Sequence, residues 1–510
     1  MTGAGRLDES VPALLTDALT LYWDNPAATE RLRHYLDRFD EPLRIAVAGS
    51  WRAGKSTLLN AILGEEVAPV EPADGGPLHT WYEDGPEPGA TAYSAEGSAW
   101  ELPVIRSTGA LRVELGGWRS TQVSEVVVRW PTRVLRHTTL VEMPAVPPTG
   151  EDEEHPTAMK IIRDADAVLY LTRDGRETDL RFLRALREGT VGRSTPVNVL
   201  QVLARADELG GGRVDALVTA KQLARRQYQE PGVRPLCMGV VPVAGLVALA
   251  GRVLSEIEFA ALAALAELPR EELTAALLSA DRFVNTQFTT VRPAGGLHAA
   301  ATDYSDSTLL PDATQRRALL DRFGVFGLRL ATTLIRTGAT NRAGLAAELV
   351  RRSGLTELRE SMARYFTDRR EVLKARSALA ALERVVRGDP RPGSADLLAR
   401  VEQVLASAHD LRELRLLATL RDPKTKIDRD LAAEAHRLVG GNGTSLAVRL
   451  ELDQDTDGGQ LWERGVDALY RWQAQAEDPL LRPDQRRIAR VVLRSVEGML
   501  AELRAGWSLH

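Results

Sequence analysis

One short stretch of this chain, residues 47–64, contains residues whose types and spacing could bind a nucleotide. It includes Gly49-x-x-x-x-Gly54-Lys55-Ser56, in which glycines let backbone amides close around phosphates. In such a phosphate-binding loop (P-loop), Lys55 would reach the terminal phosphates and Ser56 would offer its hydroxyl to Mg²⁺. The stretch follows an apolar run and opens a Leu- and Ala-rich segment, the strand-to-helix context that the motif requires. It therefore predicts a nucleoside triphosphate site, and a turn without a ligand is the alternative.

A second group, Ala204-Arg205-Ala206-Asp207, follows a later apolar run and could read the base. A carboxylate at the end of such a strand can accept hydrogen bonds from the N1–H and the exocyclic amine of guanine, and Asp207 stands at that place. The stem of Arg205 could cover the base, whereas Ala204 has no side-chain hydrogen bond to offer. Small residues at 242–245, after one more strand, suit the loop beneath a purine. Alternatively, Asp207 only caps the next helix.

The segments that must position these groups alternate in type. Between residue 43 and about residue 250, short β-rich runs alternate with helical stretches, which predicts an α/β fold with a mostly parallel sheet. On both sides of this block the apolar spacing is helical, so N-terminal and C-terminal helices are expected to pack together as an all-α bundle. The expected division is residues 1–40, N-terminal helices of the bundle; 41–250, the α/β head; 251–388, a helical bundle; and 389–510, a C-terminal helical region.

Two features of the helical half are specific enough to test. Residues 355–387 contain no Gly or Pro and predict one helix of roughly 50 Å at 1.5 Å per residue. Residues 285–312 lack periodicity and mix Gly, Pro, Ser and Thr, which predicts a long mobile loop.

Composition narrows the class of protein. A chain of 510 residues is too long for one core, and 65 basic against 70 acidic side chains give a net charge of −5, so no nucleic-acid partner is expected. The single cysteine, Cys237, suits a reducing cytoplasm and reads as a small buried hydrophobic residue. No secretory signal is expected, because acidic residues precede any apolar stretch. The longest apolar run, 236–251, is shorter than the ~20 residues of a membrane span and predicts a buried strand, a turn and a helix start.

Several motifs taken together resemble one family. These are "LRIAVAG" with "AGKSTLLNA", "TWYEDG" around Trp81, "RADELGGGRVDAL" from Arg205, "VVPVAGL" from Val240 and "LLSADRFV" from Leu278. They resemble the actinobacterial dynamin-like GTPases of the P-loop GTPase superfamily, and most closely the isoniazid-inducible branch that lacks a transmembrane paddle. The resemblance runs over most of the chain.

The resemblance implies a P-loop GTPase head of dynamin type on a helical neck or trunk, with GTP or GDP and Mg²⁺ as cofactors. It also implies a homodimer through the heads or a paralogous dynamin-like partner, in the cytoplasm, with peripheral contact at the inner face of the cell membrane. Thr57, after the magnesium serine, would touch the α-phosphate. The nucleotide-binding residues carried over are Gly49, Gly54, Lys55, Ser56, Thr57, Arg205 and Asp207.

The chain departs from the family at both switches. The first-switch threonine, which orients the attacking water, falls on Gly76, and Thr80 is the weaker substitute. The second-switch motif Asp-x-Pro-Gly is replaced by residues 142–145, Glu-Met-Pro-Ala. Glu142 would serve as catalytic residue and metal ligand with Ser56, yet it is one methylene longer than Asp, and a magnesium site tolerates little distortion. Ala145 keeps the amide that contacts the γ-phosphate but restricts the backbone.

The P-loop itself also departs from the family, which has polar residues where this chain has Trp51 and Arg52. Arg52 could supply the compensating positive charge in cis, as arginine fingers do. An exposed arginine without a role in chemistry is the alternative.

These observations predict GTP binding with slow or absent hydrolysis. One interpretation is a dynamin-like protein that acts with a paralogous partner in membrane-associated remodelling. The alternative is a catalytically silent, nucleotide-gated regulatory or scaffold subunit. A P-loop kinase or ATPase fits less well, because the "RADE" group has no place there.

Overall fold

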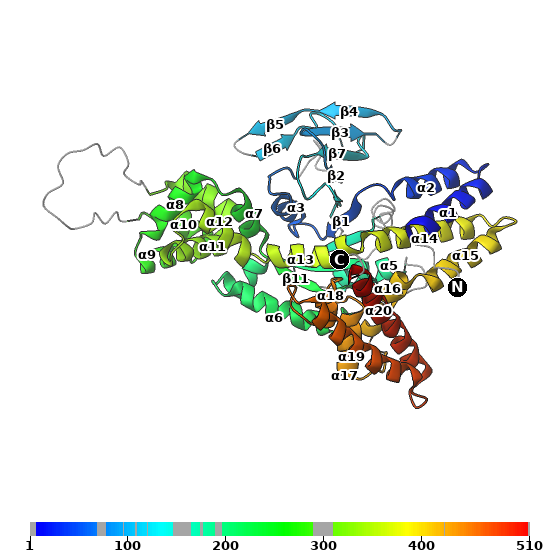
Figure 1. The fold of residues 1–510 in the computed structure, drawn as a ribbon. Helices are drawn as coiled ribbons and strands as arrows, with labels where there is room; N and C mark the ends of the chain where they lie inside the picture. The colour runs from blue at the N-terminus through cyan, green and yellow to red at the C-terminus, as the bar shows by residue number, and fades with distance from the viewer. Residues whose placement is uncertain are drawn as a thin grey trace.

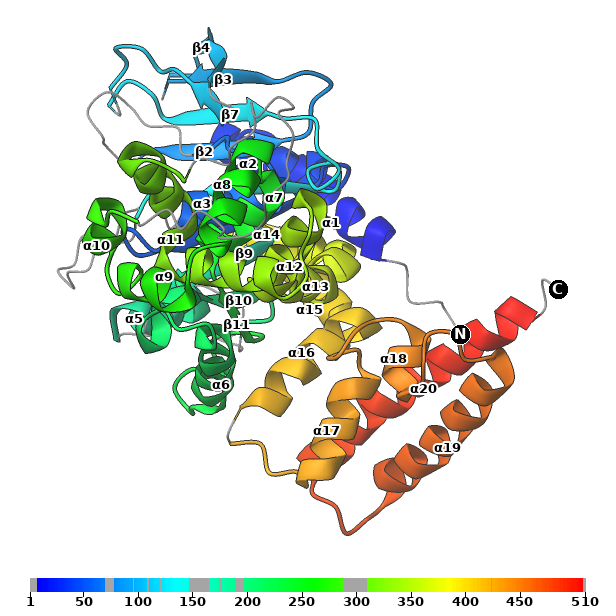
Figure 2. The same ribbon diagram turned by 90° about the vertical axis from the view of Figure 1, so that its left-hand side faces the viewer.

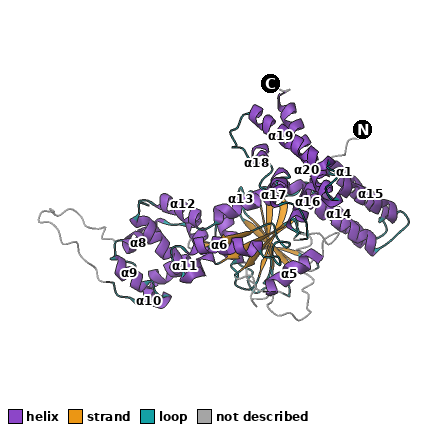
Figure 3. Ribbon diagram, turned by 90° about the horizontal axis from the view of Figure 1, so that it is seen from below, coloured by secondary structure: helices purple, strands orange, loops and turns teal. Residues whose placement is uncertain are grey.

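The protein is described here from a computed structural model. The model describes residues 7–68, 78–94, 96–107, 110–119, 121–145, 165–173, 177–188, 196–288, 310–422 and 424–507. A twisted sheet lies at the centre, and helices extend from it on two opposite sides (Figure 1). Seen from below, the strands lie between two separate groups of helices (Figure 3).

The central sheet has nine strands within the described ranges, in the order β11-β10-β9-β1-β8-β2-β7-β3-β4. Strands β11, β10, β9, β1 and β8 pair in parallel in that order, and β2 pairs in parallel with β7. The pairs β8–β2, β7–β3 and β3–β4 are antiparallel. A separate hairpin is formed by β5 and β6. The bounds are β1 Leu43–Gly49, β2 His79–Glu83, β3 Gly89–Tyr93, β4 Ala99–Leu102, β5 Val104–Ser107, β6 Ala110–Val113, β7 Glu125–Arg129, β8 Thr138–Glu142, β9 Ala167–Thr172, β10 Val199–Ala204 and β11 Val240–Val243.

Helices of the head cover the sheet, and the rest of the helices form the flanking groups. Those of the head are α3 Lys55–Leu63, α5 Glu177–Glu188, η2 Ala206–Gly211, α6 Ala216–Gln229 and α7 Gly245–Val253. The first flanking group contains α8 Glu256–Ala266, α9 Arg270–Ala276, α10 Ala280–Asn285, α11 Ala313–Arg336 and α12 Arg342–Arg352. Next come α13 Leu355–Tyr365, η3 Thr367–Arg369, α14 Arg370–Gly388 and α15 Ser394–Ser407. The C-terminal helices are α16 His409–Arg421, α17 Arg429–Leu438, α18 Leu446–Leu450, α19 Gly458–Glu477 and α20 Pro483–Trp507.

The predicted fold class is confirmed, and its basis is the burial of whole strands. Strands β8, β9 and β10 are buried along their full length, as is expected of parallel strands covered on both faces. N-terminal and C-terminal helices do pack together, because α1 Leu7–Leu21 and α2 Pro26–Asp37 share an apolar core with α14 and α15. The C-terminal helices α16 to α20 form a further group beside them (Figure 2).

The apolar run 236–251 has the structure that its sequence predicts, since β11 is followed by a turn and by α7. Among the described residues, no helix combines the length and apolar character needed to cross a membrane. The predicted loop at 285–312 falls mostly outside the described residues, between the end of α10 and the start of α11.

The prediction of one helix over residues 355–387 is wrong. The helix is interrupted between α13 and α14, where Phe366 has φ −117° and ψ −64° and the short 3₁₀ turn η3 follows. The physical reason lies in Arg369, whose buried guanidinium donates hydrogen bonds to the carbonyls of Val439 and Gly440. These carbonyls follow α17. Their hydrogen bonds to Arg369 stabilise the interrupted conformation more than helix propensity favours one continuous helix.

The N-terminal helices are attached to the sheet by a buried ion pair. Arg38, which follows α2, lies 2.8 Å from a carboxylate oxygen of Asp166, and their side chains are only 4% and 1% exposed. The other oxygen of Asp166 accepts a hydrogen bond from the backbone N–H of Arg44 at 3.0 Å. Asp166 directly precedes β9, and Arg44 lies in β1, so this carboxylate joins α2 to two central strands.

We predict that Arg38→Ala lowers the free energy of unfolding by about 3–5 kcal/mol, because it leaves the Asp166 carboxylate buried without its cation. Arg33→Ala is the matched control, since Arg33 lies on the same helix and is exposed. Chemical denaturation followed by circular dichroism measures both. Equal stability of the two variants would show that the pair does not hold α2 to the sheet.

Candidate functional site

The P-loop connects β1 to α3, and its two glycines have conformations that other residues rarely adopt. Gly54 has φ 94° and caps α3, while Gly49 has φ 154°. A Cβ atom on Gly49 would lie 2.5 Å from the carbonyl oxygen of Leu171 in the neighbouring strand β9. Both positions therefore require glycine for local reasons, and the loop places free backbone amides at the N-terminus of α3.

Lys55, the first residue of α3, folds back over the loop. Its Nζ donates hydrogen bonds to the carbonyls of Gly49 and Ser50, each at 3.2 Å. Burial lowers the pKa of Lys55, and the charge of Glu142 opposes this shift. The ammonium group thus lies on the concave side of the loop, where it can turn toward a bound phosphate.

Ser56 donates a hydrogen bond of 2.5 Å from its Oγ to Oε1 of Glu142, at the end of β8. The other carboxylate oxygen, Oε2, accepts a hydrogen bond from the Tyr82 hydroxyl at 3.2 Å. Burial, followed by the nearby charge of Glu142, raises the pKa of Tyr82 well above its usual value, so this phenol remains a donor. The buried carboxylate is therefore held between the P-loop and β2.

Thr80 lies directly opposite Glu142 in the antiparallel pairing of β2 with β8. Opposite residues in such a pair project on the same face of the sheet, and Tyr82 shares that face because it lies two positions further along β2. Thr80 is buried within the sheet. Its hydroxyl therefore lies inside a strand, whereas the threonine of a first switch lies on a loop.

The oxygen atoms of Ser56 and Glu142 belong to the class of ligand that Mg²⁺ prefers. Within the part of the chain that the structure describes, no group of three or more His, Cys, Asp or Glu could hold a metal ion. A Mg²⁺ ion would accordingly depend on Ser56, Glu142 and the phosphates of the nucleotide. The Ser56 hydroxyl can donate its proton to Glu142 and still offer an oxygen lone pair to the metal, because a hydroxyl is both donor and acceptor.

Arg52 lies at the outer side of the loop. It has φ 56°, and its guanidinium carbon is 4.0 Å from the ring centre of Trp51, which is 64% exposed. A cation stacked on an aromatic ring at this distance is a favourable contact. The structure thus places Arg52 beside the nucleotide loop but directs its charge onto a surface tryptophan.

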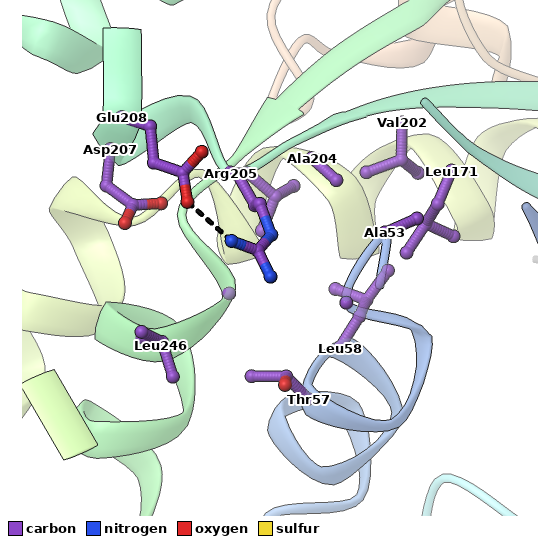
Figure 4. A pocket seen from close by; sticks show the side chains of 13 residues that line it. Ala53, Thr57, Leu58, Leu171, Val202, Ala204, Arg205, Asp207, Glu208 and Leu246 are labelled. Carbon is purple, nitrogen blue, oxygen red and sulfur yellow. Dashed lines mark hydrogen bonds and ion pairs between the residues drawn. The ribbon is translucent and has the colours of Figure 1, made fainter. Parts of the chain in front are cut away.

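A pocket of about 110 Å³ continues from the P-loop toward Asp207, and its lining includes Thr57, Arg205, Gly245 and Leu246 (Figure 4). Asp207 is only 9% exposed, and burial raises the pKa of its carboxyl. The interpretation of Asp207 as a cap for the next helix does not fit, because α6 is preceded by Asp215 at its N-cap.

Arg205 holds the rim of this pocket. It has φ 53°, its Nε donates a hydrogen bond of 3.1 Å to the carbonyl of Arg52, and its guanidinium lies 2.6 Å from Glu208. Glu208 also pairs with Arg173 at 2.6 Å. The Arg205 stem therefore lies between the P-loop and the base-side segment, as Figure 4 shows.

The structure brings together Lys55, Ser56 and Glu142 at the phosphate side, and Thr57, Arg205 and Asp207 at the pocket. Gly76 lies outside the described residues, and Ala145 follows β8 at the edge of the described part. Sequence reasoning missed Tyr82, Glu208 and Leu246. The alternation of "TWY" in β2 could have placed Tyr82 on the face of Thr80, but its contact with Glu142 depends on strand order.

Comparison with known proteins gives one close relationship over the full length. The chain is 36% identical over 509 residues to the isoniazid-induced protein IniC from two strains of Mycobacterium tuberculosis, which covers 98% of this chain and 99% of the relative. No family model matches the chain.

Solved structures give only distant likenesses. One belongs to an oligomerised bacterial dynamin pair, with a TM-score of 0.30 and 14% identity over 97% of this chain and 79% of that chain. Another is a GTP-binding protein from Sulfolobus solfataricus in complex with GDP, with a TM-score of 0.19 and 12% identity over 48% of this chain and 62% of that chain. Both TM-scores are too low to carry an argument about the site.

We predict that Lys55→Ala weakens nucleoside triphosphate binding by roughly 100-fold, because hydrogen bonds from a charged donor to two phosphates, each worth about 1.5 kcal/mol, are lost. Calorimetric titration with GTP and ATP measures the change, and the thermal midpoint checks that the fold is intact. Lys426→Ala, which removes an exposed lysine, is the control. Undiminished affinity in Lys55→Ala would identify the loop as a structural turn.

Proposed function

We propose, from the premise that this chain belongs to the dynamin-like GTPase family together with the isoniazid-induced protein IniC, that it binds guanine nucleotides and hydrolyses GTP slowly. The observation that carries this proposal is a complete P-loop beside a buried Glu142, whose longer carboxylate is held by Ser56 and Tyr82 where the family has aspartate. The loop that would cradle the phosphates is complete, whereas Thr80 is buried in β2 and Arg52 is stacked on Trp51. Binding and cleavage are therefore separable in this site.

The binding step uses groups that the fold holds in place. The amides of the P-loop and the N-terminus of α3 would surround the phosphates, with Lys55 as the mobile positive charge. Thr57 would contact the α-phosphate, and Asp207 would accept hydrogen bonds from guanine, with Arg205 covering the base. Mg²⁺ held by Ser56 and Glu142 would neutralise phosphate charge when bound.

Slow cleavage follows from the position of the Glu142 carboxylate. Phosphoryl transfer depends mostly on positioning and electrostatic stabilisation. Glu142, held by Ser56 and Tyr82, is one methylene longer than aspartate, and a near-octahedral Mg²⁺ site would tolerate little of that distortion. The stacking of Arg52 on Trp51 likewise keeps its positive charge away from the phosphates. Thr80 would have to leave the buried face of β2 to orient water.

We further propose that the protein acts with a paralogous dynamin-like partner, or as a homodimer through its heads, in membrane-associated remodelling. The exposed Trp51 beside the P-loop offers an apolar contact for a second head. We assign the chain to the isoniazid-inducible, paddle-lacking branch, located in the cytoplasm with peripheral contact at the inner face of the membrane. The alternative function is a catalytically silent, nucleotide-gated regulatory or scaffold subunit. The longer Glu142 and the buried Thr80 favour it if no partner restores hydrolysis.

We predict that the protein prefers GTP and GDP over ATP by roughly 100-fold, because a buried carboxylate left unpaired by adenine is costly. Asp207→Ala should reduce this ratio toward unity by weakening GTP binding. Asp215→Ala, which removes an exposed carboxylate outside the lining of this pocket, should leave the ratio unchanged. Competitive titration measures all three proteins, and equal affinity of the parent chain for GTP and ATP would refute the role of Asp207.

Hydrolysis is tested by restoring the residue types that the family has at the two switches. We predict that Gly76→Thr, Glu142→Asp and Ala145→Gly together raise the single-turnover GTP rate at least about 10-fold, whereas each change alone does little, since metal, water and γ-phosphate contacts act as a unit. The three single variants are the controls. A triple variant as slow as the parent, or fast hydrolysis by the parent without a partner, would contradict the explanation.

Arg52→Ala tests the other route to cleavage in the unmodified chain. If the slow hydrolysis uses the Arg52 charge, its removal lowers the remaining rate, and partner-stimulated turnover falls with it. An unchanged rate would leave Arg52 as a surface residue beside Trp51.

A further inference from the structure

A second, larger cleft lies where the head meets two helices of the helical half. It has a volume of about 970 Å³ and is lined by α6 and β11 of the head and by α13 and α17. It shares no lining residue with the pocket beside the P-loop. Figure 1 shows β11 between α6 and α13, with α17 below them. The cleft is therefore a separate site, formed only when these elements are assembled.

The charges that line this cleft are unbalanced. Five arginines stand against two glutamates, and one of these, Glu357, is already paired with Lys221 at 2.8 Å. Within the described ranges, no ion pair joins any of the five arginines to a carboxylate. They are Arg225, Arg234, Arg364, Arg421 and Arg429.

The unpaired positive charge is most costly at Arg421, because this side chain is only 2% exposed. Its guanidinium donates hydrogen bonds to the carbonyls of Leu417 at 3.1 Å, Cys237 at 2.8 Å and Pro196 at 2.7 Å, and to the sulfur of Met238 at 2.7 Å. All these acceptors are neutral. A buried cation whose partners are all neutral is costly unless an anion lies nearby.

The neighbouring titratable group, His436, does not offset the positive charge of the arginines. Burial, followed by the charges of Arg421, Arg369 and Arg234, lowers the pKa of His436 to about 4. His436 is therefore neutral at pH 7 and leaves the arginines as the dominant charges. Arg234, from the loop after α6, and Arg421 both lie near enough to His436 for their charges to act on it.

The remaining lining residues comprise hydrogen-bond donors and apolar side chains, the latter called the apolar wall. Tyr228 and Asn442 carry polar groups, and burial raises the pKa of Tyr228, so its phenol stays protonated. The apolar wall comes from Leu200, Val241 and Leu420. Arginine and phenol donors suit an oxyanion, and the apolar wall suits a ring or a short hydrocarbon portion.

We propose that this cleft binds a phosphorylated ligand. The phosphate is held by Arg234 and Arg429, the buried charge of Arg421 adds to the positive potential, and the remainder of the ligand lies against the apolar wall. The planar fork of arginine matches phosphate oxygens in pairs. The cleft also falls within the range of roughly 300–1,000 Å³ that is usual for small-ligand sites. A soluble phosphorylated compound and the headgroup of an anionic phospholipid share this chemistry. Either would bridge the head to α13 and α17.

The experiment uses the full-length Lys55→Ala chain, so that the P-loop contributes little, and inorganic pyrophosphate as the probe in calorimetry. We expect saturable binding that Arg234→Gln with Arg429→Gln weakens at least about 10-fold, because two charged donors are lost. Arg226→Gln with Arg490→Gln is the matched control, since it removes the same charge from exposed arginines outside the cleft. Arg234 and Arg429 are also exposed, so all variants should keep the thermal midpoint of the parent.

A second arm distinguishes the two sources of phosphate with vesicles of equal parts phosphatidylcholine and phosphatidic acid. Loss of vesicle binding in the cleft variant but not in the control identifies a lipid headgroup, whereas unchanged vesicle binding identifies a soluble ligand. The proposal is overturned if pyrophosphate does not bind, or if cleft and control variants bind it equally. It is also overturned if polyglutamate binds the cleft more tightly than pyrophosphate does, since the site would then recognise an acidic peptide.

Discussion

The parallel pairing of β1 with β8 and β9 is the constraint on which the rest of the site depends. In this register Val47 lies beside Glu142, and Gly49 lies beside Leu171. The P-loop therefore leaves the sheet at the point where β8 ends, so a carboxylate at residue 142 must meet the first turn of α3. Because one residue of slippage would turn that carboxylate to the other face, the chemistry of the site is decided by strand register before any ligand binds.

The carboxylate that this register places at the site belongs to Glu142, whose side chain is longer than the aspartate of the family motif. Glutamate is long enough to accept the Ser56 hydroxyl directly while Tyr82 holds its other oxygen, and the nearby Lys55 offsets its charge. Such a buried carboxylate, with a hydrogen bond to each oxygen, joins the first turn of α3 to β2 and stabilises the site without a ligand.

Local patterns of the sequence were sufficient for part of this account. Gly49 and Gly54 were predictable because a P-loop needs glycine at each turn, and the α/β class was predictable because whole strands are apolar. Contacts between distant segments were not. Tyr82 meets Glu142 only through the pairing of β2 with β8, and the helix breaks at Phe366 because the acceptors of Arg369 lie after α17. The arginines of the cleft come from separate elements, so no sequence motif could predict that they line one site.

Helix α11 connects the helical half to the segments that follow α3 and η2, the elements after the P-loop and around Asp207. It bends at Gly324, where φ is 63° and ψ is 172°. Before the bend, Arg322 pairs with Glu66, just after α3, and beyond the bend Arg329 donates a hydrogen bond of 2.7 Å to the carbonyl of Gly212, just after η2. A Cβ on Gly324 would lie 3.5 Å from Leu246 of the base pocket. The far end of α3 and the end of η2 are therefore tied to opposite halves of one bent helix, so a displacement of α3 relative to η2 must be accommodated at the bend.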